Sequence, residues 1–300
     1  MKNQAALKGL VSFIFLMALF AAAAGLFWPG SGEPNTFTNF RGELVTISGR
    51  GLYRYDTISS AAQMQANDLV TLVLGLPLLA LSSFLAFRGS LRGQLLLTGT
   101  LGFFLYTYMS MSFNTAFNEL FLVYVALFSF SLLAFILSMM SFDLASLPQQ
   151  FSARLPRQAI AGVLFAASLF LLLAWVGGRI LPPLLQNQAP LLENTTTMVI
   201  QAMDLGLILP LCLLSGILLL RRSPWGYLLA SVSVMKFLTM GLAVSTMGIN
   251  MALKGVPDSP VILAVFLTLT LTNLVLAVLL LKNIHTGIRP GSRQESPIAA

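Results

Sequence analysis

The stretch GLVSFIFLMALFAAAAGLFW occupies residues 9–28 and contains no charged side chain. A helix rises about 1.5 Å per residue, so a stretch of this length is enough to cross roughly 30 Å of hydrocarbon. It exceeds the apolar region of a cleaved signal peptide, which runs to about 15 residues, although the alanines at 21–24 resemble a cleavage region. We therefore expect a retained transmembrane helix, with a cleaved signal peptide as the alternative.

Seven further stretches of similar character follow, separated by charged or Pro- and Gly-rich breaks. They are Leu69–Phe87, Leu95–Phe113, Leu120–Met140, Ile160–Val176, Val199–Leu220, Tyr227–Met247 and Val261–Leu281. Of the 300 residues, 57% are hydrophobic and 9% charged, whereas soluble domains are roughly a quarter charged. An ordinary globular protein is excluded, and the sequence predicts an all-α membrane protein with about eight transmembrane helices in a lipid bilayer.

Basic residues set the expected direction of the spans. Eleven of the 17 Lys and Arg fall in the termini and alternate loops on one side, five fall on the other side, and Lys236 lies within the seventh span. The positive-inside rule then predicts a plasma (inner) membrane protein with both termini in the cytoplasm. Because the basic residues stand singly or in pairs between apolar runs, the net charge of +7 does not indicate nucleic-acid binding.

Two motifs occur twice in the chain. The pattern Q-A-x-D-L begins at Gln65 and Gln201, and the pattern P-L-x-x-x-S-x-x-x-x-x-R-x-S-x-x-G-x-L-L begins at Pro77 and Pro210. The repetition predicts two tandem four-helix halves of equal orientation, residues 1–150 and 151–283, before a disordered cytoplasmic tail at 284–300. Each proline lies inside a predicted helix, removes one backbone hydrogen bond and can kink that helix.

The longest segment between predicted spans covers residues 29–67 and is expected outside the cell. Within it, residues 43–47 and 52–56 read as two short strands about the Gly-containing turn 48–51. The sequence therefore predicts a small extracytoplasmic hairpin as a cap. This outward loop is also where we expect a protein partner or a second copy of the chain to bind.

Lys236 is the first candidate functional residue. It lies about ten residues from the inner end of its span and hence about 15 Å deep, and Asn273 lies at similar depth on the last span. A lysine at mid-bilayer costs about 2.5–3.5 kcal/mol, so it should face the bundle interior or water and find a partner. A substrate or proton site is one hypothesis, and a structural lysine that pairs with Asp204 or snorkels is the other.

The repeated Gln and Asp residues extend this candidate site. Gln65 with Asp68, and Gln201 with Asp204, each place two polar side chains three residues apart on one helix face, near the outer end of the helix. With Lys236 and Asn273 they form the predicted ligand-binding or transport site, in which the two pairs line a shared outward vestibule. Helix capping by the two aspartates is the alternative hypothesis.

A weaker candidate is an outward pocket of mixed aromatic and charged character, although an aromatic belt explains its tyrosines equally well. Its members are Tyr53, Arg54, Asp56, Tyr106, Asn118 and Glu119. Cys212 and His285 are the one cysteine and the one histidine of the sequence, which excludes a thiolate cluster and paired-histidine haem. We expect no metal, no cofactor and no catalytic residue.

The segment Gly51-Leu52-Tyr53-Arg54-Tyr55-Asp56-Thr57, followed by Ala61-Ala62-Gln63 and Asp68, resembles a group of uncharacterised prokaryotic multi-pass membrane proteins. The resemblance extends over most of the membrane region and implies a bacterial or archaeal plasma membrane, without an activity. Duplicated halves, mid-helix prolines and an intramembrane lysine favour a small-solute or ion transporter. A non-catalytic sensor or partner-binding protein comes second, and a membrane-embedded enzyme acting on lipid or quinone third.

Overall fold

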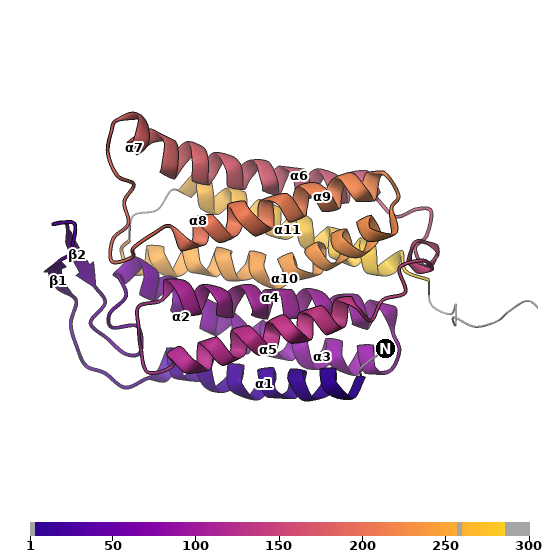
Figure 1. The fold of residues 1–300 in the computed structure, drawn as a ribbon, viewed down its shortest axis with the longest axis horizontal. Coiled ribbons are helices and arrows are strands. Elements are labelled where there is room, and N and C mark those ends of the chain that lie inside the picture. Colours follow the sequence, from indigo (N-terminus) through magenta and orange to yellow (C-terminus); the bar gives the residue numbers. More distant parts are fainter. Residues whose placement is uncertain (1–3, 257–259, 286–300) are drawn as a thin grey trace, which may run out of the picture.

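The computed structural model describes residues 4–256 and 260–285, and these form a bundle of long helices with a hairpin at one end (Figure 1). The regular elements in chain order are α1 (Gln4–Phe27), β1 (Asn35–Thr38), β2 (Leu44–Ile47), α2 (Ile58–Val70), η1 (Thr71–Gly75), α3 (Leu76–Phe87), α4 (Leu91–Asn114), α5 (Phe121–Met139), η2 (Leu147–Gln150), α6 (Arg157–Leu171), η3 (Leu172–Ile180), α7 (Leu181–Leu185), α8 (Val199–Met203), η4 (Asp204–Ile208), α9 (Leu209–Leu220), α10 (Pro224–Leu253) and α11 (Pro260–Lys282). Of the η segments, η2 is a 3₁₀ turn and the other three are π-helical.

Within residues 4–256 and 260–285, seven helices, counted with the π-helical turns they contain, are long and apolar enough to cross a membrane. This agrees with the predicted all-α membrane class. The predicted span Leu95–Phe113 lies in α4, where glycine, serine, threonine and tyrosine interrupt the leucines and phenylalanines. Helix α4 packs against α3, α5 and α10, so protein rather than lipid surrounds most of it. The count of eight spans stays a prediction.

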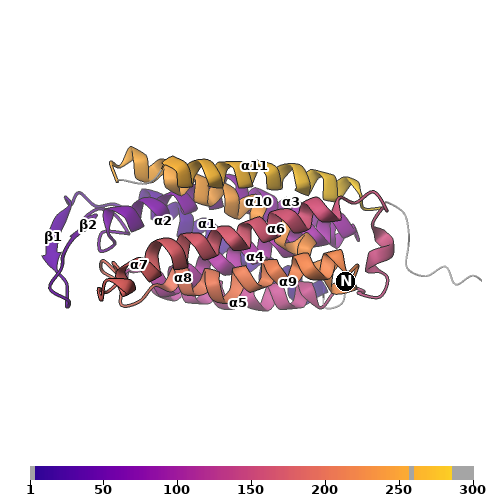
Figure 2. The same cartoon turned by 90° about the horizontal axis from the view of Figure 1, so that it is seen from above.

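The helices form two groups that follow the order of the chain. Figure 1 shows α1–α5 in the lower part of the bundle, in indigo to magenta, and α6–α11 in the upper part, in rose-red through orange to yellow. The groups meet where α10 packs against α4 and α2. In Figures 1 and 2 the hairpin projects from one end of the bundle, and the two ends of the described chain lie at the opposite end.

The two predicted mid-helix prolines follow π-helical turns. Proline has no N–H, so Pro77 and Pro210 cannot form the usual backbone hydrogen bond to the preceding turn. In the structure the N–H of Leu76 donates to the carbonyl of Thr71, and the N–H of Leu209 donates to the carbonyl of Asp204. Each turn is widened by one residue, and the helix continues through it.

The turns α3–α4 and α9–α10 share one geometry. The N–H of Ser90 donates to the carbonyl of Leu85 at 3.1 Å, and the N–H of Ser223 donates to that of Leu218 at 3.0 Å. The residue before each serine has a positive φ, +86° at Gly89 and +57° at Arg222. These are Schellman C-caps, for which glycine is the favoured residue.

The predicted hairpin needs a correction. Residues 44–47 form a strand as expected, but its antiparallel partner is β1 at residues 35–38, and residues 52–56 form a turn. Leu52 and Tyr53 are each 1% exposed, because this segment packs into the helix bundle instead of lying on its surface. Burying a leucine and a tyrosine stabilises the fold more than an exposed strand pair would.

The predicted tail largely falls outside the described residues, which end at His285. Its first residue, Ile284, is 3% exposed and forms a β-bridge with Phe151. Arg92 also donates to the carbonyl of Ile284, at 2.8 Å. The ordered part of the second group therefore extends at least one residue beyond the predicted boundary at 283.

Candidate functional site

A cavity of about 480 Å³ lies between the two groups of helices. Its lining comes from α2 and α4 of the first group, from α6, η3, α8, η4, α10 and α11 of the second, and from residues 191–198 between α7 and α8. Along α10 it extends from Met251, near the hairpin end, to Lys236, which at 1.5 Å per residue is roughly 22 Å. Beyond Lys236 the bundle is closed, because Leu95, Leu228 and Leu280 are at most 1% exposed.

Lys236 lies at the deep end of this cavity. The residue is 7% exposed, and its ammonium nitrogen lies 4.4 Å from the centre of the Tyr106 ring and 5.2 Å from that of Phe237. Within the described residues it makes no hydrogen bond and no ion pair. Helix α4 approaches closely here, since a side chain at Gly99 would begin 2.8 Å from the backbone nitrogen of Lys236. The lysine is buried against aromatic rings rather than against an acid.

Asp204 is held by other partners. Its Oδ1 accepts a hydrogen bond from the Tyr106 hydroxyl at 2.6 Å, and its Oδ2 accepts one from the Trp175 indole N–H at 2.9 Å. The structure therefore does not contain the direct Lys236–Asp204 ion pair, which was one form of the structural hypothesis beside snorkelling. Tyr106 connects the two charges, because its hydroxyl binds Asp204 while its ring contacts Lys236.

Two more predicted site residues line the same cavity. Asn273 donates from Nδ2 to the carbonyl of Val234 at 3.0 Å, which places it beside Lys236 as its expected depth implied. Its Oδ1 is buried without a hydrogen-bond partner among the residues that the structure describes. Gln201 lines the cavity three positions before Asp204. The second Gln–Asp pair, Lys236 and Asn273 are thus brought together.

The first Gln–Asp pair lies elsewhere. Gln65 and Asp68 do not line the cavity, and Asp68 is 3% exposed among the residues packed around α1. Its Oδ2 accepts a hydrogen bond from the Tyr53 hydroxyl at 2.6 Å. A side chain at Gly25 of α1 would collide with this carboxylate. The two pairs do not share one vestibule, because Asp68 binds the outer loop rather than facing the cavity.

The capping hypothesis for the two aspartates is wrong. Helix α2 begins ten residues before Asp68, and its N-cap is Thr57, whose hydroxyl accepts the N–H of Ser60. Met198 precedes α8, so Asp204 lies within the helix rather than at its N-cap. Both carboxylates instead accept hydrogen bonds from aromatic side chains.

Of the six residues of the predicted outward pocket, five lie where residues 53–56 meet the turn between α4 and α5, and Tyr106 lies apart from them. Tyr53 binds Asp68, and Tyr106 lines the cavity. Arg54 and Glu119 form an exposed ion pair, in which the Arg54 guanidinium lowers the pKa of Glu119. The Asn118 Oδ1 accepts the N–H of Leu120 at 2.9 Å.

Asp56, the remaining member of that group, is 1% exposed. Its Oδ1 accepts hydrogen bonds from the N–H of Ala116 at 3.0 Å and from the Ser60 hydroxyl at 3.1 Å. Burial raises the pKa of this carboxyl to about 6, and the two hydrogen bonds oppose that rise. Asp56 thus connects the outer loop to the α4–α5 turn.

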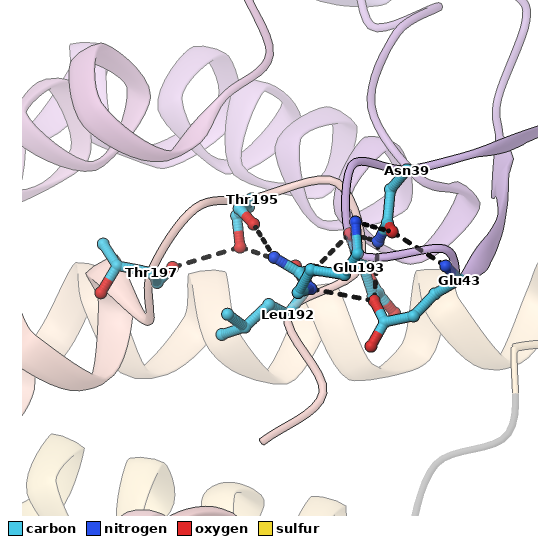
Figure 3. Close-up of polar contacts among 7 residues, drawn as sticks. Asn39, Glu43, Leu192, Glu193, Thr195 and Thr197 are labelled. Atoms are coloured by element: carbon cyan, nitrogen blue, oxygen red, sulfur yellow. Dashed lines mark hydrogen bonds and ion pairs between the residues drawn. The ribbon is translucent and has the colours of Figure 1, made fainter. Parts of the chain in front are cut away.

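Residues 191–198, which we call the cover segment, form the hairpin end of the cavity and are tied to the hairpin (Figure 3). The carbonyl of Glu193 accepts from Asn39 Nδ2 at 2.9 Å and from the Arg41 guanidinium at 2.8 Å. Arg41 also donates to the carbonyl of Thr195 at 3.1 Å, and the Thr57 hydroxyl donates to the Glu193 carboxylate at 2.9 Å. Glu193 has φ +51°, so these bonds hold a strained backbone in place.

Trp175, Glu193, Asn39 and Arg41 were not predicted from the sequence. An indole N–H inside a predicted span needs an acceptor, which is a signal that would have singled out Trp175. The contacts between hairpin and cover segment join residues about 150 positions apart, as from Arg41 to Thr195, and no local pattern marks them.

The part of the chain that the structure describes contains no group of three or more His, Cys, Asp or Glu residues arranged to hold a metal ion. Comparison of the chain with models of protein families, with curated proteins and with solved structures gave no match.

Proposed function

We propose that this protein is a membrane transporter for a small solute, and that the cavity ending at Lys236 is its substrate site. One observation carries the proposal: a cavity of about 480 Å³ lies between two groups of helices and reaches a lysine in the interior of α10. Ligand pockets for small molecules span about 300–1,000 Å³, so the volume is suitable. Sites at an interface between two helical groups are typical of transporters.

The proposed orientation places the hairpin outside the cell and both termini in the cytoplasm of a plasma membrane. Positive charge supports it, since Arg88, Arg92, Arg221 and Arg222 lie at turns on the end opposite the hairpin. In this orientation the cover segment lies at the outer end of the cavity, and packed leucines close its inner end.

The proposal includes two halves that arose by duplication. The π-helical turns η1 and η4 lie 133 positions apart, and so do the Schellman caps at Gly89 and Arg222. Gly93 and Gly226, also 133 apart, each allow the next helix to approach the end of the preceding one. Two helical groups with equivalent π-helical turns and Schellman caps suit a rigid-body rocking motion about the α4–α10 contact.

The test is flux. Purified protein in sealed vesicles is exposed to an equimolar mixture of water-soluble organic carboxylates, alcohols and amines, and the vesicle contents are measured by mass spectrometry. At least one compound should enter faster than into protein-free vesicles, and Lys236→Met should reduce that entry about tenfold or more. Entry no faster than into protein-free vesicles for every compound refutes the transporter.

A second candidate function is sensing, and one observation favours it. Phe40 and Leu44 of the hairpin are 75% and 78% exposed, and the hairpin is hydrogen-bonded to the cover segment of the cavity. A ligand that moves the cover segment would then move an exposed apolar surface. A sensor binds the compound without moving it across the vesicle wall, so the flux experiment separates the two functions.

A further inference from the structure

The charged and apolar residues that line the cavity indicate the chemistry of its ligand. We infer that it binds an organic monoanion with an apolar body, and that the anionic group lies against the Lys236 ammonium. This inference rests on the proposed function in that it takes the cavity to be the substrate site. The argument depends on which charged groups of the lining are already occupied.

Four lining residues carry formal charge: Lys236, Arg179, Asp204 and Glu193. Both carboxylates are occupied, Asp204 by Tyr106 and Trp175, and Glu193 by Thr57. Neither cation makes a hydrogen bond or an ion pair within the described residues. An ammonium has three donors and no acceptor, so the unused hydrogen-bonding capacity of the charged groups in this cavity is capacity to donate.

An organic cation is the ligand that this arrangement disfavours. To pair with Asp204 it would have to share an oxygen with the Tyr106 hydroxyl or the Trp175 indole, and it would lie near the Lys236 charge. A neutral ligand would leave the buried ammonium with aromatic contacts alone. An anion supplies the acceptor that Lys236 lacks, in surroundings of low dielectric where a charge-assisted hydrogen bond is strong.

The walls determine the rest of the ligand. Phenylalanines 170, 237 and 266 and five methionines line the cavity between Lys236 and the cover segment, and Met198 of the cover segment adds a sixth. Methionine side chains are flexible and polarizable, and they adapt to ligands of different shape. A small inorganic anion would leave most of this apolar volume unfilled. The fitting ligand is therefore an amphiphile such as an alkyl or arylalkyl carboxylate.

Two sources can supply such a molecule, the bilayer and the aqueous phase. A long-chain carboxylate reaches the cavity from the membrane, and a short arylalkanoate reaches it from water. Both present the same chemistry to Lys236, so the inference names the class, and the experiment distinguishes the sources.

The experiment measures quenching of Trp175 fluorescence in the full chain, reconstituted in lipid nanodiscs, with Trp28 and Trp225 replaced by Phe. The probes are an ω-brominated dodecanoate and the corresponding brominated dodecanol. The carboxylate should quench in a saturable manner, and its apparent Kd should be lower than that of the alcohol by about tenfold or more. Competition by unlabelled phenylbutyrate indicates the aqueous source, and competition by dodecanoate alone indicates the bilayer.

Lys236→Met is the test variant, and Lys254→Met is its matched control. Lys254 is exposed at the far end of the same helix and does not line the cavity. Lys236→Met should weaken carboxylate binding about tenfold or more and alcohol binding less than about threefold, while Lys254→Met changes neither. Equal effects of the two variants overturn the inference.

A second outcome overturns the inference without any variant: equal affinity of the unsubstituted cavity for carboxylate and alcohol, or quenching that does not saturate. The outcomes also separate this inference from the proposed function. Saturable, Lys236-dependent binding without flux refutes the transporter and leaves the anion site. Flux of alcohols or amines that is unaffected by Lys236→Met supports transport, but it refutes the anion site and the assignment of the substrate site to Lys236.

Discussion

Replacing Lys236 by methionine should make the ligand-free protein more stable. A lysine at mid-bilayer costs about 2.5–3.5 kcal/mol, and an ammonium over an aromatic ring recovers up to about 2 kcal/mol. Lys236 has such a contact with Tyr106 at 4.4 Å and, within the described residues, no acidic partner. Methionine has a similar length and removes the buried charge, so the free energy of unfolding should rise by about 1 kcal/mol.

The assay is reversible unfolding in mixed micelles, followed by tryptophan fluorescence, with Lys254→Met as the control. Replacing an exposed lysine such as Lys254 should change the free energy of unfolding by less than about 0.5 kcal/mol. The reasoning is refuted if Lys236→Met lowers stability by about 2 kcal/mol or more. That result would mean that the charge of Lys236 is needed by Asp204 in the absence of ligand, as the structural hypothesis holds.

Three further predictions concern the outer loop and the repeated turn. Asp56 has an ordinary pKa of 3.8 and a pKa of about 6 in the fold, so stability should be highest below about pH 4 and fall as the pH rises through 6. Asp56→Asn should flatten this dependence in pH-stepped unfolding and stabilise the protein at pH 7 by about 1–3 kcal/mol, and an unchanged slope would contradict it. Arg222 has φ +57° at a cap position that suits glycine, so Arg222→Gly should raise the free energy of unfolding by about 1 kcal/mol. Arg221→Gly, at φ −75° next to it, should lower that energy, and the same sign for both would contradict the reasoning. Arg41→Ala removes two hydrogen bonds that hold the cover segment, so this segment should open more often. In a Cys212→Ser background, an impermeant maleimide should then label a cysteine introduced at Met247, inside the cavity, several-fold faster. Arg50→Ala, which loses a bond to Gly32 instead, should leave that labelling rate unchanged.

The apolar runs made the helices predictable, because a backbone in lipid must satisfy its own hydrogen bonds. Lys236 and Asn273 were predicted to lie near each other from their depth in the membrane alone. The fixed rise per residue of a helix gives both residues a similar distance from the inner ends of their spans. Asp204 and Gln201 followed from a repeated motif. These residues do lie around one cavity.

What the sequence did not reveal depends on contacts between distant segments. The strand partner of residues 44–47 was misassigned because aromatic and charged side chains alternate over residues 53–56 as in a strand. In the structure Leu52 and Tyr53 instead pack in the core with residues of α1, α2 and α5. The cover segment was missed for a related reason, since its role depends on Asn39 and Arg41 reaching across from the hairpin. Periodicity reports the face of an element, but it does not report which element will cover that face.

The two π-helical turns explain why the two Gln–Asp motifs were misleading as an equal pair. Both turns precede a proline at the same spacing, but the first residue of η1 is Thr71 and the first residue of η4 is Asp204. Asp68 comes three residues before η1, almost a full helical turn earlier. The motif is therefore shifted against the backbone in the first group of helices.

This shift separates the functions of the two aspartates. Asp68 accepts a hydrogen bond from the Tyr53 hydroxyl and so fixes the segment that leads from the hairpin into α2. Asp204 is the first residue of the π-helical turn η4 beside the cavity, and it accepts hydrogen bonds from Tyr106 of α4 and Trp175 of η3. For the proposed organic anion, a second free carboxylate in the cavity would compete for Lys236. Because Asp68 lies outside the cavity and Asp204 is held by Tyr106 and Trp175, the two lining charges without a partner among the described residues are both positive.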